Sequence, residues 1–168
     1  MSDDIKTPPI ELSDDQMAPA DIPSMLLPLV GETLLLPTSA VVEMAPIQPF
    51  DIIPNTPDWF IGYYPWRNVR VPIVSYETMN ECSSPKINAR GRIAVLNNPE
   101  GSEKTPFVGL LIQDIPRMIK VAENDIVLND QLAARNYDLM PVKVGVEALF
   151  IPDVVHIVSA VEGLNLLR

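Results

Sequence analysis

Short apolar runs, interrupted again and again by proline, glycine and asparagine, constrain the fold of this chain more than any other feature. The sequence holds 18 prolines in 168 residues, and from Ile22 onward its apolar runs span four to eight residues. Proline donates no backbone hydrogen bond, so it is confined to strand starts, sheet edges and turns. The pattern, which begins at Ile22, therefore predicts an all-β fold of two small barrels built from short strands.

The expected strands follow one another along the chain. They are Met25–Val30, Thr33–Leu36, Ala40–Met44, Val69–Tyr76, Gly91–Asn97, Pro106–Gln113, Pro116–Val121 and Gly145–Ile151. Gly31-Glu32 predicts a two-residue hairpin turn between the first two strands. Asn129–Tyr137 has an asparagine start and helix-permitting residues, so it predicts a short helix. His156–Leu167 predicts an amphipathic helical tail.

Composition limits where the chain works and what it binds. Residues 1–23 are acidic and polar without a period, which predicts a mobile leader before a folded domain over 24–168. The start lacks the basic and apolar regions of a signal peptide, and no run of ~18 apolar residues follows, so we expect a cytoplasmic protein. The net charge of −10 argues against nucleic acid and against anionic lipid as partners.

The sequence offers little material for catalysis. Cys82 is the single cysteine and His156 the single histidine, so neither a cysteine metal cluster nor a Cys-His dyad can form within the chain. No glycine-rich phosphate loop is present, and the paired carboxylates lie in the leader. We expect no enzyme, no catalytic residue, no metal and no cofactor.

Residues Asn55–Tyr76 concentrate aromatic side chains and arginines of the kind favoured at protein interfaces. On an alternating strand the five rings of this stretch cannot all face one core, so we expect some of them at a surface. Arg67 follows Trp66 at an expected turn. It is either a solvated turn residue or a planar donor for a partner carboxylate.

The same stretch resembles the CheW-like coupling proteins of bacterial chemosensory systems. The resemblance rests on Asn55-Thr56-Pro57, Gly62, Arg67 and the strand Val69–Val74, in the family's spacing. The opening hairpin and Val41–Glu43 also fit. The resemblance implies a pair of five-stranded SH3-like β-barrels packed together. It also implies a non-enzymatic adaptor that links the cytoplasmic tip of a chemoreceptor to the regulatory domain of a CheA-like histidine kinase.

The family's contact residues can be carried over position by position. The receptor contact maps to the hairpin turn, and the kinase contact maps to the first barrel of the family. The implied receptor-binding residues are Arg67, Trp66 and Asn68, and the implied kinase-binding residues are Val41, Glu43, Ile61 and Gly62.

Several positions depart from the family pattern. Asn68 replaces the turn glycine but still tolerates a positive φ, Pro65-Trp66 replaces Asn-Leu, and Ser75-Tyr76 replaces Asp-Leu. These departures and the chain length resemble the accessory, ChpC-like coupling proteins of type IV pilus (twitching motility) chemosensory systems. A different class stays open as an alternative, namely a β-barrel module that binds a small ligand or a peptide and is unrelated to kinase coupling.

Overall fold

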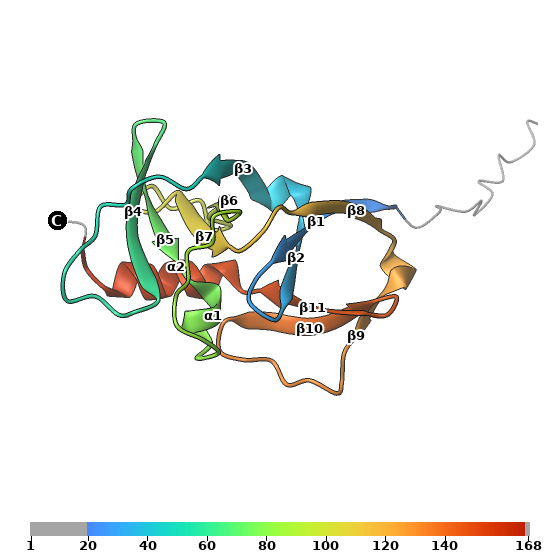
Figure 1. The fold of residues 1–168 in the computed structure, drawn as a ribbon. Helices are drawn as coiled ribbons and strands as arrows, with labels where there is room; N and C mark the ends of the chain where they lie inside the picture. Colours follow the sequence, from blue (N-terminus) through green and yellow to red (C-terminus); the bar gives the residue numbers. More distant parts are fainter. Residues whose placement is uncertain (1–19, 167–168) are drawn as a thin grey trace, which may run out of the picture.

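The computed structural model describes residues 20–166, which form two β-sheets (Figure 1). The first sheet combines both ends of the described chain, in the order β8-β1-β2-β11-β10-β9. Its strands are β1 (Ile22–Pro28), β2 (Thr33–Pro37), β8 (Arg117–Val121), β9 (Ile126–Leu128), β10 (Asp138–Val144) and β11 (Glu147–Pro152). All neighbours in this sheet run antiparallel except β2 and β11, which touch in parallel.

The middle of the chain forms the second sheet, in the order β3-β6-β7-β5-β4. Its strands are β3 (Val41–Pro46), β4 (Phe60–Trp66), β5 (Val69–Val74), β6 (Arg92–Asn97) and β7 (Phe107–Ile112). The two sheets confirm the expected all-β fold of two packed subdomains. The second has the expected five strands, whereas the first has six because the three-residue strand β9 adds to the edge of β10.

Few helices accompany the sheets: α1 (Tyr76–Met79), α2 (Val154–Gly163) and the 3-10 turns η1 (Thr38–Ala40) and η2 (Glu123–Asp125). Helix α2 confirms the expected helical tail. The carboxylate of Asp153 caps it by accepting the His156 N–H at 3.1 Å. At 10 residues, α2 is the longest helix described, and no described helix could span a bilayer.

The main core lies between the two sheets. It joins Leu27 and Leu34 of the first sheet, Leu96 and Leu110 of the second, and the apolar face of α2 around Ile157. Each sheet also keeps a smaller core of its own. Because one contiguous cluster draws on both sheets and on α2, the two subdomains pack as one unit.

Two local expectations are wrong. The segment Asn129–Tyr137 forms turns rather than a helix. There the Asn129 side chain accepts the Gln131 N–H at 3.3 Å, a local bond that competes with helix formation. The first hairpin closes through four residues, 29–32, rather than two. The Val30 N–H in this loop donates instead to the Glu77 carboxylate at 3.0 Å.

Of the five rings expected to lie partly at a surface, the four on β4 are core residues, so the expectation is wrong for this strand. Trp59, which precedes β4, is half-buried against the main core. Phe60 and Tyr63 lie in the main core, whereas Tyr64 and Trp66 lie in the core of the second sheet. All four are less than a tenth exposed. Both faces of strand β4 pack against apolar layers. A bulge between Phe60 and Gly62 shifts the alternation of side chains, so Phe60 and Tyr63 point to one layer and Tyr64 and Trp66 do not share it.

The expected acidic leader, residues 1–23, falls almost entirely outside the described residues. Strand β1 already includes Ile22 and Pro23, which pair with β8. Cys82 lies on an exposed connection after α1, and His156 stacks on Tyr137 with a ring separation of 4.6 Å.

Candidate partner-binding site

The site begins with the tight turn that joins β4 to β5. Trp66 pairs with Val69, so Arg67 and Asn68 alone make the connection. Their φ angles are 45° and 64°, and positive φ at both positions is the mark of a type I′ turn. Asparagine adopts this region readily, as the sequence predicted for Asn68, but arginine seldom does. The turn therefore holds Arg67 at the projecting tip of the hairpin, visible at the top of Figure 1.

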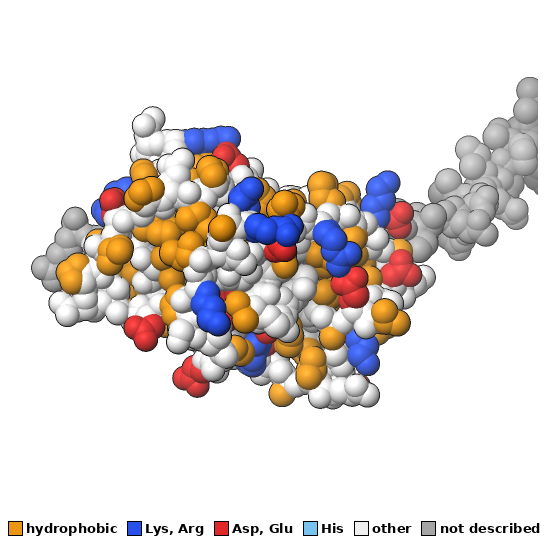
Figure 2. Space-filling view, in the orientation of Figure 1, with side chains coloured by type: hydrophobic (Ala, Val, Ile, Leu, Met, Phe, Trp, Pro, Cys, Tyr) orange, Lys and Arg blue, Asp and Glu red, His pale blue; other side chains and the backbone are white. Residues whose placement is uncertain are grey.

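The Arg67 side chain reaches back from this tip toward strand β3. Its Nη2 donates to Oε2 of Glu43 at 2.6 Å, and its guanidinium carbon lies 4.7 Å from the centre of the Trp66 ring. The Arg67 side chain is 67% exposed and that of Glu43 is 34% exposed. Figure 2 shows basic and acidic side chains side by side at this end of the molecule. The guanidinium is therefore oriented but accessible.

Trp66 supports the arginine from below. Its ring meets Phe107 edge to face, with centroids 5.0 Å apart, and the residue is 7% exposed. Its indole Nε1 has no hydrogen-bond partner among the described residues. Trp66 is thus a buried platform under Arg67 rather than an exposed ring.

Strand β3 supplies Val41 and Glu43. Both are half-buried, and a bulge separates them where β3 pairs with β6. Glu43 also acts on the neighbouring core: burial raises the pKa of the Tyr64 hydroxyl, and the nearby Glu43 carboxylate raises it further. The neutral Tyr64 hydroxyl donates to the Pro46 carbonyl at 2.8 Å, which ties β4 to the end of β3.

Ile61 and Gly62 lie at the opposite end of β4 from the tip. Ile61 to Trp66 spans five strand residues, which at the usual rise is about 16 Å. Gly62 is buried with φ 145°, and a Cβ there would stand 2.7 Å from the Asp51 carbonyl oxygen. Asp51 and Tyr63 exchange two backbone hydrogen bonds, at 2.8 and 3.0 Å. Gly62 therefore permits a backbone contact that joins the segment after β3 to β4, the two edge strands of the second sheet.

The structure brings together four of the seven sequence-predicted residues at the hairpin tip, namely Glu43, Trp66, Arg67 and Asn68. The other three lie apart from this cluster: Ile61 and Gly62 at the far end of β4, and Val41 at the start of β3. The cluster thus mixes three expected receptor residues with one expected kinase residue.

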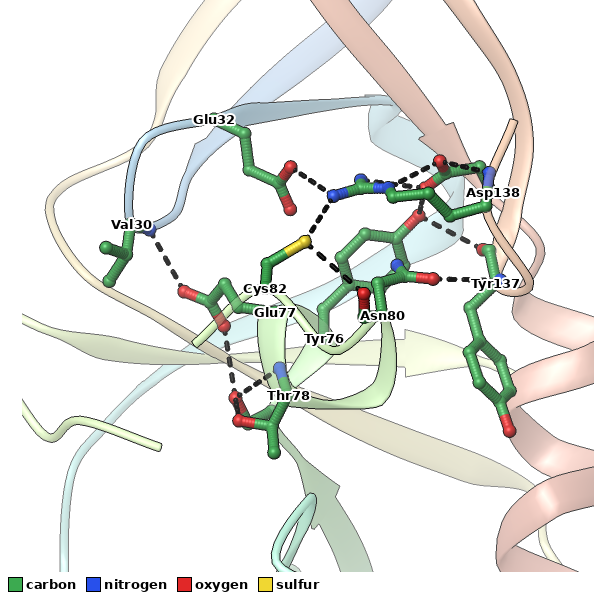
Figure 3. Close-up of polar contacts among 11 residues, drawn as sticks. Val30, Glu32, Tyr76, Glu77, Thr78, Asn80, Cys82, Tyr137 and Asp138 are labelled. Atoms are coloured by element: carbon green, nitrogen blue, oxygen red, sulfur yellow. Dashed lines mark hydrogen bonds and ion pairs between the residues drawn. The ribbon is translucent and has the colours of Figure 1, made fainter. Parts of the chain in front are cut away.

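Sequence reasoning missed a second polar cluster, in which Arg135 pairs with Glu32 and Asp138. Figure 3 labels Glu32 and Asp138 together with Tyr76 and Cys82 of the same cluster. Arg135 donates to Glu32 at 2.7 Å, to Asp138 at 2.8 and 3.0 Å, and to the Cys82 sulfur at 2.9 Å. The Tyr76 hydroxyl donates to Asp138 as well. Arg135 and Glu32 are 103 positions apart, so no local sequence signal could have paired them.

Burial and ion pairing shift the pKa values of the two carboxyl groups in this second cluster in opposite directions. Burial raises the pKa of the Glu32 carboxyl, and this outweighs the lowering effect of Arg135. For Asp138, burial also acts to raise the pKa, but hydrogen bonds from Arg135 and Tyr76 outweigh it and hold the pKa below its usual range. The cluster ties α1 to the β1–β2 loop and to the start of β10, which makes its evident role structural.

Within residues 20–166, no group of three or more histidine, cysteine or acidic side chains is placed to hold a metal ion. The exposed guanidinium of Arg67 is held in place by Glu43 and by the Trp66 ring. A guanidinium binds a carboxylate through two parallel hydrogen bonds, so the hairpin tip is suited to the recognition of a carboxylate.

Comparisons with known proteins place the chain in a family. A family model described as the CheW-like domain matches residues 23–162. The crystal structure of the scaffolding protein TtCheW from Thermoanaerobacter tengcongensis has a similar fold, with a TM-score of 0.68 and 16% sequence identity over 82% of this chain and 87% of that chain. A search of the curated proteins gives no match. The chain therefore belongs to the CheW-like domain family, whose scaffolding proteins are not enzymes.

Proposed function

We propose that this chain is a chemosensory adaptor that couples the cytoplasmic tip of a chemoreceptor to the regulatory domain of a CheA-like histidine kinase. The observation that carries the proposal is the Arg67 guanidinium, held exposed at the tip of a rigid turn within a CheW-like domain. Its role requires no chemistry, only simultaneous or alternating contact with two protein partners. The adaptor domain is proposed to span residues 24–168.

The proposed receptor contact is the hairpin tip. Arg67 supplies the charged donor, and Asn68, exposed beside it, supplies a neutral polar edge. Trp66 contributes indirectly, because its ring is buried and supports the guanidinium by a cation–π contact. An acidic side chain on the receptor would replace Glu43 as the partner of Arg67.

The proposed kinase contact follows the edge strands β3 and β4 of the second sheet, although the family resemblance had mapped it to the first barrel. Glu43 and Val41 present a half-exposed stretch of β3, and Ile61 presents the bulged part of β4. Gly62 acts through the backbone, because it lets Asp51 approach β4 and so shapes the surface around Ile61. Charge and apolar area are both present, as is usual for signalling interfaces of modest size.

An assembly assay tests the adaptor role. Receptor fragment, kinase regulatory domain and this protein are mixed at tens of micromolar and separated by size-exclusion chromatography. We expect both partners to co-elute with the native protein. We expect Arg67→Glu to lose the receptor and keep the kinase. Arg117→Glu is the matched control, since its side chain is equally exposed and paired but lies in the other sheet. Absence of both partners would contradict the proposal.

We further propose that the adaptor serves a type IV pilus system as a ChpC-like accessory member. The support is the departure of Pro65-Trp66 and Asn68 from the usual turn, which alters the surface offered to a receptor. Deletion of the gene should then reduce twitching motility while leaving swimming unaffected. A swimming defect with normal twitching would instead assign the protein to a flagellar system.

A further inference from the structure

Strands β5 and β7 are neighbours, yet they pair over only part of their length. The parallel ladder joins Ile73 to Gly109 and Val74 to Leu110 and extends no further. In the same register, Val69 to Pro72 would face residues 105–108. Instead, a groove of about 420 Å³ separates the hairpin arm, Asn68 to Pro72, from residues 103–107.

Pro72 explains why the ladder stops. Backbone N–H and C=O groups alternate in direction along a strand. Residues 69, 71 and 73 of β5 turn these groups toward β4. Residues 70, 72 and 74 therefore turn theirs toward β7. On β7, Phe107 and Gly109 turn toward β5, since Pro106 accepts the Asn98 N–H on the other side. The next ladder bond would run from residue 72 to the Phe107 carbonyl, and proline has no N–H to donate. The backbone groups of Arg70 and Phe107 therefore turn toward the groove, beyond the last residue pair of the described ladder.

The far wall of the groove is preformed. Asn98, 6% exposed, organises the loop between β6 and β7. Its amide donates to the Thr105 carbonyl at 2.8 Å, its side-chain oxygen accepts the Glu100 N–H at 3.0 Å, and its backbone N–H donates to Pro106 at 2.9 Å. A wall held in this way would lose little conformational entropy when a ligand binds.

An unpartnered polar group lies in this wall. Thr105 lines the groove and is 2% exposed, yet its Oγ1 has no hydrogen-bond partner among the described residues. Lys104 and Glu103 lie on one wall of the groove. Arg70, on the opposite side, is 52% exposed, and its Nε lies 3.7 Å from the Asp51 carboxylate. Among the described residues Lys104 forms no ion pair, so it is the cation most available to a ligand.

We propose that this groove, residues 68–72 and 103–107, binds an extended acidic segment of a partner protein as an added β-strand. The segment's backbone pairs with Arg70 and Phe107, where Pro72 has ended the native ladder, and its carboxylates face Lys104. Strand addition to an unpaired edge is a recurrent mode of peptide recognition. The site extends beyond the proposed adaptor role, because it requires neither the Arg67–Glu43 pair nor either of its partners.

Backbone amide exchange followed by NMR tests the open edge first. In the free protein, the Arg70 and Phe107 amides should exchange about 100-fold faster than those of Val71 and Gly109, which belong to ladders. The probe is then acetyl-Glu-Val-Glu-Val-Glu amide. Its binding should slow both exposed amides and shift the Thr105 signal, while the lysine counterpart of the peptide should have no effect.

Two variants sharpen the test. Pro72→Val restores the missing N–H, so the ladder should extend, Phe107 should become protected, and the probe should no longer bind to a fully folded protein. Lys104→Glu should weaken probe binding about tenfold, whereas Lys143→Glu in the other sheet should not. Equal protection of Arg70 and Val71 in the free protein, or no saturable shift at millimolar probe, would overturn the proposal. If the native protein in that case still bound the receptor fragment and the kinase domain, the proposed adaptor role would remain supported.

Discussion

The Nη2 atom of Arg67 lies 2.6 Å from Oε2 of Glu43, so the arginine expected to contact a receptor is paired with the glutamate expected to contact the kinase. Both side chains are partly exposed, and such pairs contribute at most about 1 kcal/mol to stability. A partner carboxylate can therefore displace Glu43 from Arg67 at little cost. The pair offers a direct physical link between the two proposed contacts.

Replacing Glu43 by glutamine should change the two contacts in opposite directions. Arg67 loses a competing carboxylate, so affinity for a receptor fragment should rise about two- to fivefold. The kinase contact loses a charge, so affinity for the regulatory domain should fall. Isothermal titration of each fragment measures both effects. An equal fall of both affinities with an unchanged melting temperature would mean that Glu43 does not separate the two contacts.

The sequence predicted the all-β fold and most strand positions, because proline and glycine breaks mark strand ends locally. It could not predict that both faces of β4 are buried, since this depends on α2 and on residues far away in the chain. The helix expected over Asn129–Tyr137 failed for a related reason. In this segment the Arg135 side chain bonds to Asp138 and also to Glu32, which lies 103 positions earlier in the sequence.

The candidate site was predictable only in part. The positive φ of Asn68 follows from the residue type and the turn position. The pairing of Arg67 with Glu43 could not be anticipated, because it depends on how the second sheet curls to bring β3 and β4 together. Trp66 was expected to contact a receptor, but its burial against Phe107 is a tertiary contact without a local signal.

Gly62 should tolerate no side chain. Gly62→Ala places a Cβ 2.7 Å from the Asp51 carbonyl oxygen at a φ of 145°, so we expect a loss of about 3 kcal/mol in the free energy of unfolding. Gly31→Ala is the control, because Gly31 also has a positive φ but nothing lies within 4 Å of its added Cβ. It should cost about 1 kcal/mol. Urea denaturation of both variants checks the difference, and equal costs would refute the close approach.

The Arg135 cluster should be far more important for stability than a surface ion pair. Arg135→Met leaves the Asp138 side chain, 0% exposed, without its cation, so we expect a loss of about 3–5 kcal/mol. Arg117→Met removes the exposed pair with Glu147 and should cost at most about 1 kcal/mol. Thermal unfolding of both variants gives the comparison. Similar melting temperatures would show that the cluster is not a structural clamp.

The same cluster should give the protein a characteristic pH profile. The raised pKa of Glu32 favours the protonated carboxyl in the folded state, so its stabilising contribution is lost as pH rises from about 4.3 through the folded value. The lowered pKa of Asp138 favours the ionised carboxylate in the folded state. Its contribution to stability is therefore lost as pH falls below about 3.9.

Glu32 faces Arg135, Asp138 and Glu77, so the variant Glu32→Gln isolates its titration. Between about pH 4 and neutrality, native stability should decline with rising pH, and the variant should lack that decline. Urea midpoints across this range provide the measurement. Parallel profiles for both proteins would exclude Glu32 as the titrating group.

The most direct test of the adaptor role uses Arg67→Asn. Asparagine suits a positive φ better than arginine, so the variant should be at least as stable as the native protein. Titration calorimetry of the native protein should detect both a receptor fragment and a kinase regulatory domain. The variant should still bind the kinase domain, through a Glu43 that is no longer paired, and should bind the receptor fragment at least about tenfold more weakly. Unchanged receptor affinity in a fully folded variant would contradict the account.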